Sequence, residues 1–247
     1  MTMIARGRPA YFITANVHYA MLTEQHPDLG PINQGAELIL ADGAPLVWAS
    51  RFRKVVLPER VAGSDLIYDL CEKAAGLGHS VFLLGAGPGI ADEAARRLVE
   101  RYPALRIAGT ACPGPDELGG EPGRALVERI RSARPGLLLV AFGQPKGERW
   151  IAENLEALGV PACVQVGATL DFVAGRVRRA PRIYQKIGME WAYRMAQEPG
   201  RLVPRYSRNI LFILRSIARD LTGRGGQPEQ AAPIPLSLAQ ETAGPSS

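Results

Sequence analysis

Short apolar segments alternate along the chain with segments whose apolar residues recur every three or four positions. The short segments predict six buried strands: Tyr11–Ala15, Glu37–Ala41, Ser80–Gly85, Leu105–Thr110, Leu137–Phe142 and Val160–Val166. The longer period predicts helices at Ser64–Leu77, Ala91–Tyr102, Arg124–Ala133 and Glu148–Leu158. Continuous apolar strands that alternate with helices are typical of a mostly parallel sheet with helices on both faces, so we expect a Rossmann-like α/β fold.

The pattern changes after Gly175, where strand signals stop and basic helical segments follow near Ile183–Gln197 and Arg205–Leu221. On a helical wheel, the second segment carries one stripe formed by Arg205, Arg208, Arg215 and Arg219. Its apolar residues lie opposite: Ile210, Ile213, Leu214, Ile217 and Leu221. Such a helix either lies on an anionic bilayer or packs on the protein body with its arginines outward.

These changes divide the chain into three regions. We predict an α/β catalytic core at 1–175 and a basic helical appendage at 176–222, which we expect to dock on a membrane. The segment 223–247 is rich in Gly, Pro, Gln, Ala and Ser, a composition that predicts a disordered tail.

The charge distribution indicates an anionic partner. The net charge is +5, but the segment from Arg176 to Arg224 holds twelve Lys and Arg against three acidic residues, which leaves the rest of the chain at −4. A skew of this kind favours a membrane surface or nucleic acid as partner, although a solvated pair of basic helices would look the same.

Several features favour a cytoplasmic protein. No stretch reaches the ~18 apolar residues of a transmembrane helix, and the N-terminus has no apolar signal segment. Cys71, Cys112 and Cys163 are far apart and form no C-x-x-C pair, which argues against a disulfide framework and a cysteine zinc site.

Polar residues follow the first two predicted strands. Thr14 and Asn16 lie at the end of the first, and Asp42 ends the second. Because parallel strands end at one edge of the sheet, where ligands of α/β folds bind, these side chains are expected to converge. A carboxylate there could take a proton from a hydroxyl, although Asp42-Gly43 is also a common turn sequence.

Two further loops follow strands. Gly85, Gly87 and Gly89 precede a helix, and backbone N–H groups in such a loop suit a diphosphate. The spacing is not G-x-G-x-x-G and Pro88 removes one N–H group, so a simple tight turn is equally compatible.

The loop after the fifth strand holds Gln144, Lys146 and Glu148. Lys146 could meet a phosphate, and Glu148 could accept hydrogen bonds from sugar or ribose hydroxyls or cap a helix.

Missing motifs narrow the choice of chemistry. The sequence has no P-loop and no G-x-S-x-G elbow, and His18, His26 and His79 have no metal-ligand spacing. It also has no D-x-D, so a divalent cation lacks its usual ligands and Arg or Lys would have to neutralise a leaving diphosphate. We therefore expect neither a metal nor a cofactor.

Taken together, these segments resemble the WecG/TagA/CpsF family, family 26 of the glycosyltransferases, over nearly all of Tyr11 to Arg208. The blocks that carry the resemblance occur in family order: Thr14–Asn16, Ala41–Gly43, Glu59–Leu66, Phe82–Gly85, Tyr102–Pro103, Gly143–Trp150, Val166–Ala168, Asp171–Phe172, Arg179–Pro181, Glu190–Arg194 and Glu198–Arg201. Each block is weak alone, but the ordered set is specific. One departure is Gly147, where the family usually has Gln. A donor contact made by that amide is either lost or supplied by Gln144.

The resemblance implies an inverting, metal-independent transferase that acts in surface polysaccharide synthesis at the inner face of the membrane. It would move a sugar, N-acetylmannosamine or a related hexose, from a UDP-sugar to a polyprenyl-diphosphate-linked sugar. The appendage is similar to the part that docks the enzyme on the membrane and completes a neighbour's site, which allows a homo-oligomer. No nucleic acid partner is implied.

Residue by residue, Asp42 matches the general base, Thr14 and Asn16 match its neighbours, and Arg60 matches an arginine near the diphosphate. The candidate nucleotide-sugar residues are Gly85, Gly87, Gly89, Gln144, Lys146, Glu148 and Asp171. The candidate acceptor or membrane residues are Arg194, Arg201, Arg205 and Arg208.

Two other functions stay open at this point. The glycine loop alone would suit an NAD-type oxidoreductase. The basic C-terminal region alone would suit a non-catalytic module that binds a membrane or nucleic acid.

Overall fold

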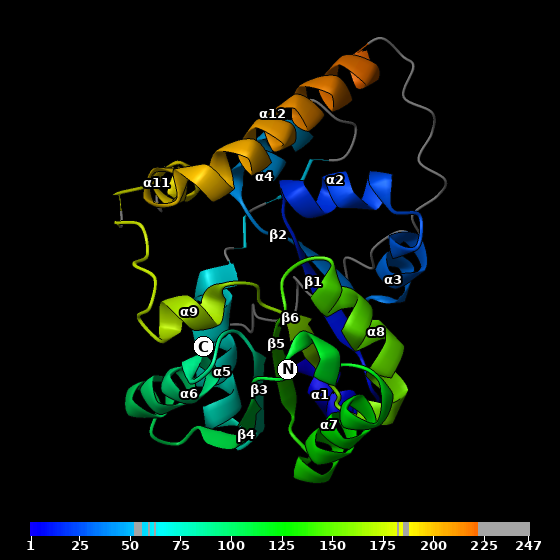
Figure 1. Cartoon of the computed structure of the whole chain (residues 1–247), viewed down its shortest axis with the longest axis vertical. Coiled ribbons are helices and arrows are strands. Elements are labelled where there is room, and N and C mark those ends of the chain that lie inside the picture. The colour runs from blue at the N-terminus through cyan, green and yellow to red at the C-terminus, as the bar shows by residue number, and fades with distance from the viewer. Residues whose placement is uncertain (52–55, 59, 62, 182, 185–187, 222–247) are drawn as a thin grey trace, which may run out of the picture.

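A single all-parallel sheet of six strands forms the centre of the protein, in the order β2-β1-β6-β5-β3-β4 (Figure 1). The computed structural model describes residues 1–51, 56–58, 60–61, 63–181, 183–184 and 188–221, so the predicted tail lies outside the described residues. The strands are β1 (Tyr11–Ala15), β2 (Leu38–Ala41), β3 (Ser80–Gly85), β4 (Arg106–Ala111), β5 (Leu137–Ala141) and β6 (Cys163–Gln165). The predicted α/β fold is confirmed, and all six predicted strands are present.

Helices surround the sheet on both faces. The N-terminal half contains α1 (Thr2–Arg6), α2 (Val17–Gln25), α3 (Leu29–Gly35), α4 (Ala44–Ser50), α5 (Gly63–Gly76) and α6 (Ile90–Arg101). The C-terminal half contains η1 (Pro115–Glu117), α7 (Gly120–Ala133), α8 (Lys146–Leu158), α9 (Thr169–Val173), α11 (Glu190–Gln197) and α12 (Pro199–Leu221). The predicted helices of the core correspond to α5, α6, α7 and α8, whereas the sequence pattern did not predict α1, α2, α3, α4 and α9.

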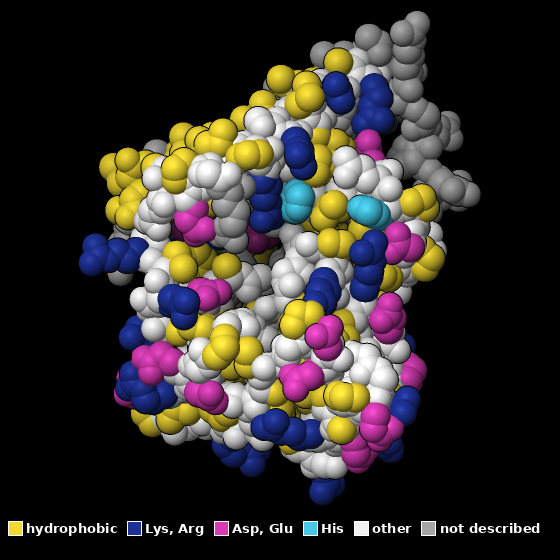
Figure 2. Space-filling view, viewed as in Figure 1, with side chains coloured by type: hydrophobic (Ala, Val, Ile, Leu, Met, Phe, Trp, Pro, Cys, Tyr) yellow, Lys and Arg dark blue, Asp and Glu magenta, His cyan; other side chains and the backbone are white. Residues whose placement is uncertain are grey.

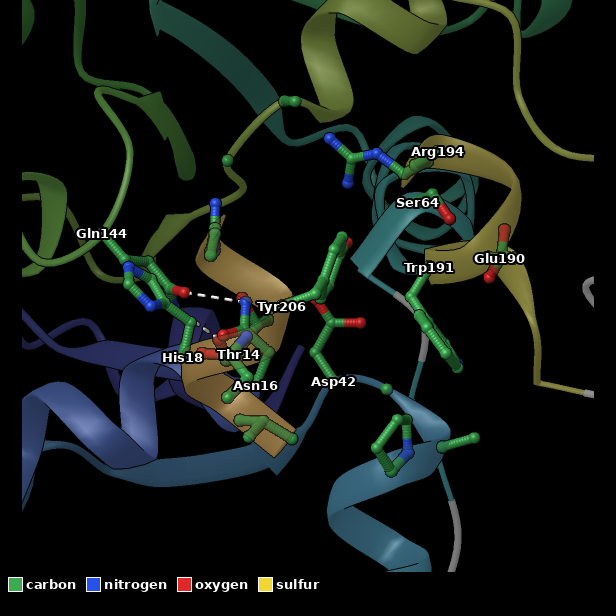
Figure 3. Close-up of a pocket in the computed structure, with 18 of the residues that line it drawn as sticks. Thr14, Asn16, His18, Asp42, Ser64, Gln144, Glu190, Trp191, Arg194 and Tyr206 are labelled. Carbon is green, nitrogen blue, oxygen red and sulfur yellow. Dashed lines mark hydrogen bonds between the residues drawn. The ribbon is translucent and has the colours of Figure 1, made fainter. Parts of the chain in front are cut away.

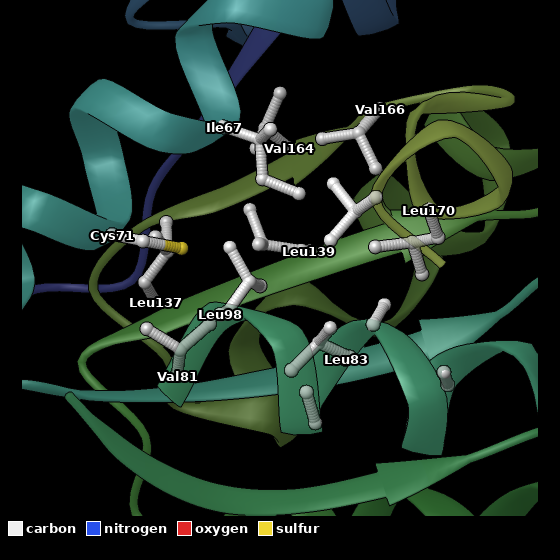
Figure 4. Close-up of a cluster of buried hydrophobic side chains, with 14 of the residues drawn as sticks. Ile67, Cys71, Val81, Leu83, Leu98, Leu137, Leu139, Val164, Val166 and Leu170 are labelled. Atoms are coloured by element: carbon white, nitrogen blue, oxygen red, sulfur yellow. The ribbon is translucent and has the colours of Figure 1, made fainter. Parts of the chain in front are cut away.

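The hydrophobic core consists of two layers, one on each side of the sheet. Along β3, Val81 and Leu83 point into one layer and Phe82 and Leu84 into the other, because successive side chains of a strand alternate between faces. Helices α5, α6 and α9 cover the first layer, part of which is shown in Figure 4, and α2, α3, α7 and α8 cover the second. Burial on both faces explains why the strands read as continuous apolar runs.

The edge strand β2 departs from the prediction of a fully buried strand. Leu38 and Ile39 are each 40% exposed. The reason is position, since β2 pairs only with β1 within the described residues and the helices packed on the sheet centre leave this edge open.

The carboxyl ends of β1 and β6 border a crevice. These strands are neighbours, but α2 follows β1 on one face while α9 follows β6 on the other. Chains that leave adjacent parallel strands towards opposite faces open a gap at the strand ends, where ligands of α/β sheets bind. The topology therefore places a binding site at this point.

Helices α11 and α12 cross above the carboxyl end of the sheet, and α12 contacts α2 (Figure 1). α12 packs on the body and exposes Arg208, Arg215 and Arg219, but it departs in two respects from the alternative in which its apolar side packs inward and its arginines point outward. Ile210 and Leu214 are exposed, whereas Arg205 lines a cavity. Across the described residues, no helix is long and apolar enough to pass through a bilayer.

Candidate active site

A cavity of about 460 Å³ lies between the carboxyl edge of the sheet and the C-terminal helices (Figure 3). Its floor is formed by residues that follow β1, β2, β5 and β6. Residues of α4, α11 and α12 form the opposite wall. We name these two parts the strand-end half and the helical half of the site.

In the strand-end half, Thr14 and Asn16 are held by hydrogen bonds to neighbouring segments. The Thr14 hydroxyl donates to the main-chain oxygen of Gln165 at 3.1 Å, which ties β1 to β6. Asn16 caps α2, where its side-chain oxygen accepts from the Tyr19 N–H group at 3.0 Å. The Asn16 amide donates to Gln144 Oε1 at 2.8 Å (Figure 3). The loops after β1 and β5 are thereby joined directly.

Gln144 is the centre of this network. Its amide nitrogen donates to the Thr14 carbonyl oxygen and to Glu148 Oε1, each at 2.9 Å. Glu148 is buried in the first turn of α8, and burial raises the pKa of its carboxyl group to about 7. Glu148 therefore supports Gln144 from below and contributes no side-chain surface to the cavity as far as the structure describes it.

Asp42 follows β2 and points its carboxylate into the cavity (Figure 3). Its Oδ1 accepts the N–H group of Gly63, at the start of α5, at 3.2 Å. Burial raises the pKa of Asp42 and the negative charge of Glu190 adds to this effect, while Gly63, Arg60 and Arg194 act in the opposite direction. A half-buried carboxylate with a raised pKa is suited to accept a proton from a substrate hydroxyl.

Ion pairs connect the two halves of the site beside Asp42. Arg60 pairs with Glu190 of α11 at 3.1 Å. Arg179 pairs with the same Glu190 at 3.3 Å and with Asp65 of α5 at 2.6 Å. Two arginines therefore stand at the cavity, where they can meet a diphosphate.

The helical half supplies aromatic and basic side chains. Trp191 of α11 packs against Tyr206 of α12, and the Arg194 guanidinium lies over the Phe172 ring at 5.2 Å from its centroid. Arg205 lines the cavity near His18, and burial together with this positive charge lowers the pKa of His18. His18 therefore lies in a basic corner of the site.

The structure brings together about half of the predicted site residues. Thr14, Asn16, Asp42, Arg60, Gln144, Arg194 and Arg205 all line the cavity. Among the described lining residues we do not find Gly85, Gly87, Gly89, Lys146, Glu148, Asp171 or Arg208. The side chain of Arg201 lies outside the described part of the protein.

The glycine loop has a structural reason to contain glycine. A Cβ atom on Gly85 would lie 2.8 Å from the Phe142 ring, and Gly89 has φ +73° at the start of α6. The loop lies at the same sheet edge as Asp42, since all strands are parallel. Its role in nucleotide binding stays a prediction.

Sequence reasoning missed several residues that line the cavity: His18, Ser64, Gln165, Glu190, Trp191, Tyr206 and Asn209. Ser64, Glu190 and Trp191 lie in blocks that carried the family resemblance, so those blocks could have pointed to them. His18 lies two positions after Asn16, on the first turn of a helix that the sequence pattern did not predict. Within the described residues, no group of three His, Cys, Asp or Glu side chains could hold a metal ion.

Comparison with known proteins gives consistent matches. The model of the glycosyl transferase WecG/TagA/CpsF family matches residues 1–226. An N-acetylglucosaminyldiphosphoundecaprenol N-acetyl-beta-D-mannosaminyltransferase of Bacillus spizizenii strain W23 is 27% identical over 88% of this chain and 85% of its own length. The Staphylococcus aureus proteins of the same name are 35% identical in strain MW2, over 78% of this chain and 74% of theirs, and 36% identical in strain NCTC 8325, over 74% and 70%.

Proposed function

Because the chain belongs to the WecG/TagA/CpsF family and is a glycosyltransferase, we propose that it moves N-acetylmannosamine or a related hexose from UDP to a lipid-linked acceptor. The acceptor would be N-acetylglucosamine on a polyprenyl diphosphate, as the names of the relatives suggest, and the product would serve cell-wall polymer synthesis. Family membership sets aside the oxidoreductase and the non-catalytic binding module.

The observation that carries this proposal is the position of Asp42. Its carboxylate points into a cavity that also contains the Thr14–Asn16–Gln144 network and the arginines Arg60 and Arg194. Asp42 would take the proton of the acceptor sugar hydroxyl, whose oxygen forms a bond to the anomeric carbon of the donor while the bond to UDP breaks. Attack from the side opposite the leaving UDP inverts the anomeric configuration.

The leaving UDP accumulates negative charge, which the site can offset without a metal ion. Arg60 and Arg194 line the cavity, and the positive charges of both act on Asp42. The loss of one preorganised contact of this kind raises an activation barrier by ~3–4 kcal/mol. Glu190 neutralises Arg60 in the structure, so the diphosphate would compete with Glu190 for this guanidinium.

We further infer that α12 docks the enzyme on an anionic membrane at the inner face. Its outer side exposes Val203, Ile210, Leu211 and Leu214, which we name the apolar edge, and Leu214 is 60% exposed. Figure 2 shows hydrophobic side chains along this side of the helix, with basic side chains beside them. This combination is typical of a helix that inserts its apolar side among lipid headgroups. Since Ile210 also lines the cavity, the edge leads to the site where a lipid-linked sugar would react.

A transfer assay tests the function. The purified protein is incubated with a panel of UDP- and GDP-sugars and a short-chain lipid-diphosphate N-acetylglucosamine, and the products are separated by chromatography. We expect transfer from UDP-N-acetylmannosamine or a related UDP-hexose, unchanged rates with EDTA, and an inverted anomer by NMR. Protection against heat by UDP and not by NAD is expected as well. Hydrolysis or turnover without a lipid-linked product would contradict the proposal.

A further inference from the structure

Gln144, which could supply the amide that is missing at Gly147, already has hydrogen-bond partners of its own. Its side-chain oxygen accepts from Asn16, and its nitrogen donates to both Thr14 and Glu148. An amide group offers two donor hydrogens, and both are used at 2.9 Å. The Gln144 side chain is thus engaged at both ends in holding the strand-end half together.

Gln165, the last residue of β6, has the opposite properties. It is 1% exposed and lines the cavity, yet neither its side-chain nitrogen nor its side-chain oxygen has a hydrogen-bond partner within the described residues. A buried polar group without a partner costs about 1–3 kcal/mol. An unpaired amide that lines a cavity would therefore be stabilised by a ligand that supplies the missing hydrogen bonds.

Gly147 makes room for this side chain. A Cβ atom built on Gly147 would lie 2.6 Å from Gln165 Cδ and 2.8 Å from Gln165 Oε1, closer than such atoms approach in proteins. Any larger residue at position 147 would collide with Gln165 where it now lies. Glutamine at 147 would therefore displace the Gln165 side chain from this position.

We propose that Gln165 binds the sugar of the nucleotide-sugar donor and so determines donor specificity in this chain. The proposal rests on the function proposed above. The Gln165 main-chain oxygen accepts the Thr14 hydroxyl, so the residue is tied to the strand that carries Thr14 and Asn16. Its free N–H and C=O groups complement a partner that offers both an acceptor and a donor. An acetamido substituent does this, and so do two neighbouring hydroxyl groups.

The test uses Gln165→Leu in the full-length enzyme, with the exposed Gln34→Leu of α3 as the matched control. Leucine keeps much of the volume and removes both unpaired polar atoms. We expect the donor KM to rise about 10- to 100-fold, because polar groups of the sugar lose their partners. The Kd of UDP alone should not change, and the thermal midpoint should stay equal or rise. The control should match wild type throughout.

Two donors identify the contact. If Gln165 binds an acetamido group, Gln165→Leu lowers kcat/KM for a UDP-N-acetylhexosamine and leaves the matching UDP-hexose unaffected. If it binds hydroxyl groups, both donors lose activity together. Unchanged kcat/KM for every donor that wild type accepts overturns the proposal, and so does an equal loss of affinity for UDP alone.

An exchange variant gives an independent check. Gly147→Gln alone should lose donor binding through the collision with Gln165, and Gly147→Gln with Gln165→Gly should recover at least part of it. No recovery, in a variant that keeps the wild-type thermal midpoint, contradicts the steric argument. Failure of the wild-type enzyme to transfer any sugar sinks the proposed function instead, and is distinguishable from a failure confined to these variants.

Discussion

The two halves of the active site are built in different ways. Hydrogen bonds between Thr14, Asn16 and Gln144 hold the strand-end half on buried parallel strands. The helical half is joined to the body by half-buried ion pairs at the cavity, such as Arg60–Glu190, by the exposed pair between Arg219 and Glu24, and by packing of α12 on α2. The two halves are therefore held by different kinds of interaction.

This difference assigns different tasks to the halves. A group that takes a proton has to be held precisely, and Asp42 lies at the end of a strand with a backbone N–H group on its carboxylate. The helical half carries the apolar edge and the arginines, which suit a large, membrane-bound substrate that has to enter and leave. We therefore propose that the strand-end half carries out proton transfer and that the helical half recognises the lipid diphosphate.

The largest expected effect on activity comes from a substitution in the strand-end half. Asp42→Asn removes the proton acceptor and should lower kcat by about 10²–10⁴-fold, the range that general-base catalysis contributes. Binding of UDP, measured by calorimetry, should stay within about twofold of wild type because the arginines are unchanged. Asp69→Asn, an exposed residue of α5, is the control and should keep full activity. Wild-type turnover of Asp42→Asn would remove the base from this residue.

Glu148, which accepts a hydrogen bond from Gln144, is expected to make the stability of the protein depend on pH. Its pKa of about 7 lies above the usual 4.5, so the fold favours the protonated form. This stabilisation is fully present below about pH 4.5 and is lost as the pH rises through about 7. The loss amounts to about 3 kcal/mol in the unfolding free energy.

Glu148→Gln keeps a neutral acceptor for Gln144 and should remove this loss. Urea unfolding should show the variant more stable than wild type at pH 8 and nearly equal at pH 4.5. Glu156→Gln, exposed on the same helix, should follow the wild-type curve. A variant that is less stable at both pH values would show that the carboxylate is needed in its charged form.

The apolar edge tests the helical half separately. Replacing Val203, Leu211 and Leu214, the members of the apolar edge that do not line the cavity, with Ser should weaken binding to vesicles of phosphatidylcholine and phosphatidylglycerol at least about tenfold, since each buried side chain is worth ~1.5–3 kcal/mol. Sedimentation with the vesicles measures this. Activity on a soluble short-chain acceptor should change little, and exposed Leu77→Ser, directly after α5, serves as control. Unchanged sedimentation would remove the membrane from the proposed function.

The smallest expected effect is a change in the pH dependence of activity on substitution of Glu190, which lies beside Asp42 where the two halves meet. The Glu190 carboxylate helps to raise the pKa of Asp42, and Asp42 has to be deprotonated to act as a base. Activity should therefore rise with pH as Asp42 ionises. Glu190→Gln should move this rise to lower pH, because one of the causes that raise the pKa of Asp42 is removed. Asp65→Asn, which removes another carboxylate from Arg179, should leave the pH profile in place. A shift to higher pH would contradict the assignment.

The sequence predicted the strand-end half well because the sequence patterns that indicate it are local. Buried parallel strands appear as apolar runs, and polar residues directly after them meet at one edge of the sheet. This pattern is sufficient to predict that Thr14, Asn16 and Asp42 lie close together. The surrounding helices were harder to find. In α2 the buried residues Tyr19 and Leu22 do not lie on one continuous stripe with Val17 and Met21, so helical periodicity is weak there.

In the helical half, Arg194 and Arg205 were predicted from the family resemblance, whereas Tyr206 and Asn209 were missed because they meet the site only through tertiary packing. The wheel of α12 separates arginines from apolar residues correctly, but it cannot say which side faces the body. The structure buries Asn209 and Ser216 and leaves Ile210 and Leu214 in solvent. Gln165 was not predicted for a similar reason. Its contact with Gly147 and the lack of a hydrogen-bond partner for its amide within the described residues are visible only in the folded structure.

The steric exclusion between positions 147 and 165 also restricts how a sequence can change from one arrangement to the other. A protein with glutamine at 147 needs glycine there before glutamine at 165 can adopt the position seen here. An exchange of the two glutamines therefore takes two substitutions, and it moves the amide from helix α8 to strand β6.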